Sequence, residues 1–181
     1  MIERHQCVTM CYNIPGQTWP TELCWLYDTF KDSRSHAEIG TYCGRSLLAT
    51  CGGMKAGSSV LAVDDDSDAF NGQWVSSVRR QTFELLIPVP VTEWRMGSLQ
   101  AAVQAFDSGM RFDSVFIDAC HHYAECSADI QAWRSLIKPG GILAGHDYWP
   151  AHTGVMDAVN ELVPGFQVVP GTRIWFARQN G

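Results

Sequence analysis

The chain alternates short apolar runs with longer stretches in which apolar residues recur every three or four positions. Runs such as SVLAVD at 59–64 and SVFID at 114–118 predict strands that are buried on both faces, as in a parallel sheet covered by helices. The longer stretches predict amphipathic helices. The strands that we expect are 37–39, 59–64, 91–96, 114–118, 142–145, 166–169 and 173–177. The helices that we expect are 18–30, 45–54, 72–86, 99–106, 123–137 and 154–163.

This alternation predicts an α/β fold with a mostly parallel sheet and helices on both of its faces. The last two strands are joined by Pro170 and Gly171 without a helix, which predicts one antiparallel strand at the end. A length of 181 residues suits one domain. We therefore expect a loose N-terminal arm over residues 1–17 and a single domain over 18–181.

Composition narrows the classes of partner. The formal net charge of −6 argues against a nucleic-acid partner, because phosphate backbones require a basic surface. No apolar run approaches the length of a membrane span, and the N-terminus lacks the layout of a signal peptide. Seven cysteines without a C-x-x-C pair disfavour a zinc site or a disulfide framework. We therefore expect reduced thiols and a cytoplasmic protein.

The turn between the first expected strand and its helix has glycines at positions 40 and 44. A phosphate loop requires a lysine after the second glycine, and none follows. A dinucleotide turn requires G-x-G-x-x-G, whereas the spacing here is G-x-x-x-G. S-adenosylmethionine is the remaining cofactor class. Its amino-acid end needs an acid near the first turn, and its ribose needs an acid at the end of the second strand. Glu38 and Asp64 provide these two acids.

Six stretches carry a resemblance to a known family: EIGTYCGRS at 38–46, VD at 63–64, GS at 97–98, FIDACHHY at 116–123, KPGGILAGHDY at 138–148 and GVMDAVNE at 154–161. In this order they resemble the class I S-adenosylmethionine-dependent methyltransferases. The resemblance is strongest to the small-molecule group whose fourth strand ends I-D-G-x-H-x-Y and whose fifth ends G-x-H-D-Y. It extends from about Thr18 to Ala177 and implies a Rossmann-like, seven-stranded sheet whose last strand is antiparallel.

The resemblance also implies where the cofactor binds. The glycine turn with Glu38 would surround the methionine end, Asp64 would hold the ribose, and Gly97 with Ser98 would flank the adenine. The family often has an acid at the position of Gly97, so a backbone N–H would have to serve there. The cofactor residues that we expect are Glu38, Gly40, Tyr42, Gly44, Asp64, Asp65, Gly97, Ser98, Asp118, Ala119 and His121.

Methyl transfer requires that a proton leave the acceptor. The catalytic candidates follow the fourth and fifth expected strands and should meet at one edge of the sheet: Asp118, His121, His146 and Asp147. Asp118, His146 and Asp147 could also hold a divalent cation. Catechol-type O-methyltransferases have an oxygen ligand where this chain has His146. Mg²⁺, a softer ion and no metal therefore all stay open, as do purely structural roles for these side chains.

We therefore expect an S-adenosylmethionine-dependent O-methyltransferase that acts on a small-molecule hydroxyl, such as that of a sugar or secondary metabolite. One alternative is a non-catalytic domain that binds S-adenosylmethionine or S-adenosylhomocysteine. A second is a nucleotide-dependent oxidoreductase, which the glycine spacing disfavours. The acceptor, metal assistance and formation of a homo-oligomer are left open by the sequence.

Overall fold

The computed structural model describes residues 2–67, 72–86 and 89–179. Its centre is a seven-stranded sheet with the strand order β3-β2-β1-β4-β5-β7-β6. The strands are β1 (Ser35–Ile39), β2 (Ser59–Asp64), β3 (Val91–Arg95), β4 (Phe112–Ile117), β5 (Ile137–Gly145), β6 (Gln167–Val168) and β7 (Trp175–Arg178). Strands β1 to β5 pair in parallel, and β7 is antiparallel to both β5 and β6. The predicted fold class, including the antiparallel strand near the end of the chain, is confirmed.

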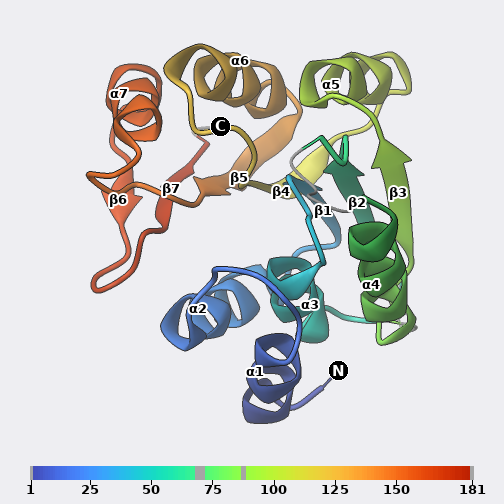
Figure 1. Cartoon of the computed structure of the whole chain (residues 1–181). Coiled ribbons are helices and arrows are strands. Elements are labelled where there is room, and N and C mark those ends of the chain that lie inside the picture. Colours follow the sequence, from blue (N-terminus) through green and yellow to red (C-terminus); the bar gives the residue numbers. More distant parts are fainter. Residues whose placement is uncertain (1, 68–71, 87–88, 180–181) are drawn as a thin grey trace.

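Helices cover both faces of the sheet (Figure 1). One layer consists of α1 (Arg4–Tyr12), α2 (Pro20–Phe30), α3 (Arg45–Gly52) and α4 (Gly72–Glu84), and the other of α5 (Ser98–Asp107), α6 (Tyr123–Arg134) and α7 (Thr153–Leu162). Each face of the sheet carries its own cluster of buried apolar side chains. Within the described part of the chain, no helix is long and apolar enough to cross a membrane.

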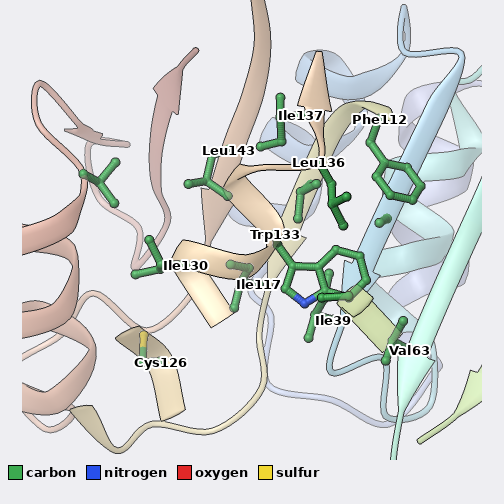
Figure 2. Packing of buried hydrophobic residues seen from close by; sticks show 14 of the residues in the cluster. Ile39, Val63, Phe112, Ile117, Cys126, Ile130, Trp133, Leu136, Ile137 and Leu143 are labelled. Carbon is green, nitrogen blue, oxygen red and sulfur yellow. The ribbon is translucent and has the colours of Figure 1, made fainter. Parts of the chain in front are cut away.

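Trp133 anchors the layer that contains α5 and α6. Its ring is fully buried and lies among Ile39, Ile117 and Leu136 in the cluster of Figure 2. The indole Nε1–H donates a hydrogen bond of 2.8 Å to Ser98 Oγ, at the first residue of α5. Loss of such a side chain costs about 3–5 kcal/mol, so Trp133 both stabilises the domain and fixes the loop after β3.

Strand β5 begins earlier than the sequence predicts. The expected helix was to continue to residue 137, but α6 ends at Arg134 and β5 already starts at Ile137. The expected break at Lys138 to Gly141 instead lies inside the strand, where the register with β4 shifts. Gly141 permits this approach, because a Cβ there would lie 2.7 Å from the carbonyl oxygen of Asp113.

The N-terminal residues form a helix, so the expectation of a loose arm is wrong. Cys7 and Cys11, one helical turn apart, are fully buried in α1. The Cys7 thiol donates to the carbonyl oxygen of Leu48 in α3 over 3.4 Å. Tyr27 in α2 donates its hydroxyl to the carbonyl of Ile2 at 2.6 Å. Both cysteines lie on one face of the helix, where they pack like small apolar residues.

Candidate active site

A cavity of about 850 Å³ lies where the parallel strands β1, β2, β4 and β5 end. Its walls come from the loops that follow these strands, from the loop after β3 and from residues 15–18 before α2. In open α/β sheets this is the edge at which ligands bind, and the volume lies in the usual range for small-molecule sites.

The glycine turn brings the backbone of β1 close to the loop after β4. Gly40 has φ +82°, and a Cβ on it would collide with the backbone carbonyl of Asp118. Only glycine fits this position. Gly44 also has a left-handed φ of +88°, but it does not line the cavity; a Cβ there would lie 3.0 Å from Thr82 Cγ2 in α4. Gly44 therefore serves helix packing, whereas Gly40 shapes the cavity.

Asp64 closes the end of β2 with both carboxylate oxygens held in place. Oδ2 accepts a hydrogen bond of 2.6 Å from Tyr42 N, and Oδ1 accepts one of 2.9 Å from Asp66 N. Arg79 of α4 is fully buried and donates to Asp66 Oδ1 and to the carbonyl of Tyr42, each at 2.7 Å. This arginine, which sequence analysis missed, fixes the loop that carries Asp64. The remaining lone pairs of Asp64 suit the two hydroxyls of a ribose.

Glu38 lies behind the cavity wall, and Ser46 stands between them. Glu38 is fully buried and accepts a hydrogen bond of 3.0 Å from Ser46 Oγ through Oε1, while its Oε2 has no partner. Burial raises the pKa of this carboxyl well above its usual range. Ser46 lines the cavity and Glu38 does not. The acid predicted for the cofactor thus lies one hydrogen bond behind the cavity lining, at a serine that the sequence analysis did not select.

The opposite end of the cavity contains Gly97, Ser98 and Ala119, as expected, and one acid that was not expected. Asp129 of α6 is only 4% exposed and lines this end. Burial raises its pKa to about 6, although a hydrogen bond with Ser98 opposes the rise. Gly97 lacks the acid common at its position, and Asp129 brings a carboxyl group to this end from another helix. In the sequence, Asp129 is one acid within a helical pattern, and nothing there indicates that it lines the cavity.

His121 and Asp147 form a hydrogen-bonded pair at the mouth of the cavity. His121 Nε2 lies 2.9 Å from Asp147 Oδ2, which leaves Nδ1 as the second ring nitrogen. The hydrogen bond with Asp147 raises the pKa of His121. Asp147 has φ +58°, a conformation that non-glycine residues seldom adopt and that clusters at functional sites.

His146 lies deeper, between carboxylates. Its Nε2 is 3.1 Å from Glu22 Oε2, and its Nδ1 is 3.3 Å from Asp147 Oδ1 and 3.7 Å from Asp118 Oδ1. Burial alone would lower the pKa of His146, but Asp118, Asp147 and Glu22 together raise it to about 10. His146 is therefore an imidazolium at neutral pH. Glu22, which sequence analysis missed, is fully buried and also accepts backbone N–H groups of Trp19 and Arg173.

The three residues predicted as metal ligands suit Mg²⁺ poorly, because one of them is an imidazole. Asp118, His146 and Asp147 bring one ligand atom each within 4.8 Å of one another, but the imidazole of His146 offers a nitrogen, whereas Mg²⁺ prefers oxygen ligands. A second group, His121, Asp147 and His152, meets the same distance limit. Its two imidazoles would suit a softer ion better than Mg²⁺, which prefers oxygen ligands.

The cavity thus gathers most of the predicted residues. The predicted side chains and glycines that line it are Gly40, Tyr42, Asp64, Asp65, Gly97, Ser98, Asp118, Ala119, His121, His146 and Asp147. Glu38 and Gly44 lie outside the lining. Asp64 can accept hydrogen bonds from a diol, the backbone comes close to the cavity at Gly40, and polar groups line both ends. These features match the shape and chemistry of a long, polar nucleoside cofactor.

A family model described as a methyltransferase domain matches residues 37–148. The matched part extends from β1 to the end of β5 and contains the glycine turn, Asp64, Asp118 and the His146–Asp147 pair. It covers more than half of the chain, which therefore belongs to the methyltransferase-domain family. Among curated proteins, no sequence matches this chain significantly.

Several solved structures with the same fold are O-methyltransferases. The O-methyltransferase of Bacillus cereus in complex with S-adenosylhomocysteine is 18% identical, with a TM-score of 0.70 over 97% of this chain and 90% of that chain. TomG of Streptomyces achromogenes, which is involved in tomaymycin synthesis and was solved with S-adenosylmethionine, is 14% identical, with a TM-score of 0.71 over 100% and 91%. CalS11, a TDP-rhamnose 3′-O-methyltransferase, is 13% identical, with a TM-score of 0.66 over 97% and 92%.

Proposed function

We propose that this protein is an S-adenosylmethionine-dependent O-methyltransferase of a small-molecule hydroxyl. The observation that carries the proposal is the single cavity that joins Gly40 and Asp64 to the His121–Asp147 pair. Membership of the methyltransferase-domain family supports the reaction class. The O-methyltransferases that share the fold support the cofactor and an oxygen acceptor.

The cofactor would lie between two groups of residues. Asp64 would accept the ribose hydroxyls, Ser46 with Glu38 behind it would receive the amino-acid end, and Ser98 would flank the adenine. Bound there, S-adenosylmethionine supplies an electrophilic methyl group. The task of the chain is then to orient the acceptor and remove its proton.

His121 is the general base in this proposal. Its Nε2–H donates to Asp147, so Nδ1 is free to take the proton of the acceptor hydroxyl. Asp147 orients the ring and stabilises the imidazolium that forms. The imidazolium of His146, held by Glu22, places a fixed positive charge beside Asp118 and Asp147. The oxygen of the methyl acceptor becomes negative next to these carboxylates as its proton leaves. The positive charge of His146 offsets the negative charge of the carboxylates.

A non-catalytic cofactor-binding domain is the competing proposal. The His121–Asp147 hydrogen bond of 2.9 Å and the left-handed backbone of Asp147 favour catalysis, because a binding domain needs neither feature. The cytoplasmic location and the absence of nucleic-acid and membrane partners stay predictions from the sequence, which leaves formation of a homo-oligomer open.

The test is transfer of label from methyl-labelled S-adenosylmethionine to a panel of sugars, nucleotide sugars and phenols. We expect one class of hydroxyl to be labelled by the wild type and a loss of transfer of about 10²-fold or more in His121→Ala. The exposed His122→Ala serves as the matched control. Retained activity in His121→Ala contradicts the role of the base, and binding of the cofactor without transfer to any acceptor supports the non-catalytic alternative.

A further inference from the structure

A second hollow of about 410 Å³ adjoins the cofactor cavity. It is lined by Tyr12, Trp19, residues 16–18, Arg45 and Arg173. Residues 16–18 and Arg45 also line the larger cavity, so the two spaces share a wall. The chain carries a net charge of −6, yet the described lining of this hollow has two arginines and no acid.

Arg45 is a fixed cation without a counter-charge among the described residues. Its Nε donates to the carbonyl of Ile14 at 2.6 Å and its Nη1 to the carbonyl of Thr18 at 3.2 Å. The guanidinium lies 5.3 Å from the centre of the Tyr12 ring, and the described residues place no carboxylate within 4.0 Å of it. The two carbonyls hold the plane of the guanidinium group in place. N–H groups on Nη1 and Nη2 remain for a ligand.

Arg173 is held between two tryptophans. Its guanidinium carbon lies 4.5 Å from the centre of the Trp19 ring and 5.6 Å from that of Trp149. The buried Nε has no hydrogen-bond partner. Nη1 lies 3.6 Å from Asp147 Oδ1, beyond hydrogen-bond distance, and Asp147 already contacts His121 and His146. Arg173 therefore has unused donors beside the proposed general base.

We infer that this hollow binds a phosphate or diphosphate group of the methyl acceptor. The inference rests on the proposed function and extends it to a substrate class. Arginine forks bind phosphate oxygens with charge-assisted hydrogen bonds, and a diphosphate offers charged oxygens to both Arg45 and Arg173. Trp19 and Tyr12 add exposed ring faces for stacking. The contact of Arg173 with Asp147 connects the anion to the catalytic pair, so the hydroxyl of a compact acceptor can reach His121.

The test is calorimetric titration of inorganic pyrophosphate into the chain, with and without saturating S-adenosylhomocysteine. We expect wild-type binding, and an affinity lower by about tenfold or more in Arg173→Gln and in Arg45→Gln, because each variant loses a charged hydrogen-bond donor. Arg178→Gln, an exposed arginine on β7, is the matched control and should change the affinity by less than about twofold. Arg173→Lys should bind less tightly than wild type, because it keeps the charge and loses the fork.

Four outcomes overturn the inference. If wild type does not bind pyrophosphate, or if Arg173→Gln and Arg178→Gln bind it with equal affinity, the hollow is not an anion site. If succinate binds as tightly as pyrophosphate, the ligand class is a carboxylate and not a phosphate. Weaker S-adenosylhomocysteine binding in Arg45→Gln, with pyrophosphate binding unchanged, assigns Arg45 to the cofactor. If wild type fails to bind S-adenosylhomocysteine, the proposed function fails, while the pyrophosphate titrations still decide the anion site.

Discussion

His146 Nε2 lies 3.1 Å from Glu22 Oε2, and both side chains are almost completely removed from solvent. The two residues are far apart in the sequence, in α2 and directly after β5. Their contact joins the N-terminal helical layer to the edge of the sheet that carries the proposed catalytic residues. It also keeps a positive charge beneath Asp118 and Asp147, where the family resemblance allows a metal ion.

Glu22→Gln should destabilise the protein. The variant leaves the buried imidazolium without its carboxylate in α2, and breaking a buried ion pair costs about 3–5 kcal/mol. Because Asp118 and Asp147 still face His146, we expect about 3 kcal/mol in urea unfolding. The control is Glu161→Gln, which neutralises the exposed carboxylate that accepts a hydrogen bond from Tyr123 and should cost less than about 1 kcal/mol. Equal losses of unfolding free energy in the two variants would show that the Glu22–His146 pair stabilises the protein no more than an exposed contact does.

Methyl transfer should persist in the presence of a chelator. His146 offers a ring nitrogen where Mg²⁺ prefers oxygen, so the Asp118, His146 and Asp147 group is poorly suited to that ion. We expect the same initial rate with and without EDTA. A rate that falls with EDTA and returns with Mg²⁺ would instead assign the Asp118, His146 and Asp147 group as a magnesium site. A return with Zn²⁺ alone instead assigns the His121, Asp147 and His152 group as a metal site.

Asp147→Asn should shift the pH dependence of the rate. The base must be neutral, and Asp147 raises the pKa of His121, so the wild-type rate should rise as pH increases through this raised pKa. Without the carboxylate the pKa falls, and the midpoint of the profile should move to lower pH. Loss of the orienting group should also lower the plateau rate by about 10²-fold. Asparagine tolerates the left-handed backbone at this position.

The control for this profile is Asp157→Asn, at an exposed position of α7, for which we expect the wild-type profile. An unchanged midpoint in Asp147→Asn would mean that His121 is not the group that titrates.

His36→Asn should make the protein less sensitive to acid. His36 is fully buried, with Nδ1 2.8 Å from Ser114 Oγ and no partner at Nε2. Burial lowers its pKa to about 3, whereas in the unfolded chain it is about 6.5. The unfolded state therefore binds the proton first as pH falls below 6.5, and stability is lost. Between pH 7 and pH 5 this one group should cost about 2 kcal/mol.

Urea unfolding at pH 5 and pH 7 measures this effect. His36→Asn cannot bind the proton, so its difference between the two pH values should be smaller than that of wild type by about 2 kcal/mol. A substitution at the exposed His122 should leave the wild-type difference in place. Identical differences in His36→Asn and wild type would show that another group controls acid unfolding.

The sequence predicted the parts of the site that follow from local pattern. Gly40 and Asp64 lie at the ends of strands that the apolar runs identify, and parallel topology brings such ends together. Glu22, Arg79 and Arg173 gave no such signal, because their partners come from distant segments: Arg173 N donates to Glu22 Oε1 across 151 positions. The helix over Arg4–Tyr12 was missed for a related reason, since only its contacts with α2 and α3 show which face is buried.

Binding of S-adenosylhomocysteine to wild type and to Asp64→Ala tests the central claim most directly. In the proposed site Asp64 accepts hydrogen bonds from the ribose hydroxyls, so calorimetry should find binding to wild type and an affinity lower by about tenfold or more in Asp64→Ala. Asp107→Ala, at an exposed position of α5, should bind like wild type. Wild type without measurable binding, or Asp64→Ala with undiminished affinity, would contradict the account.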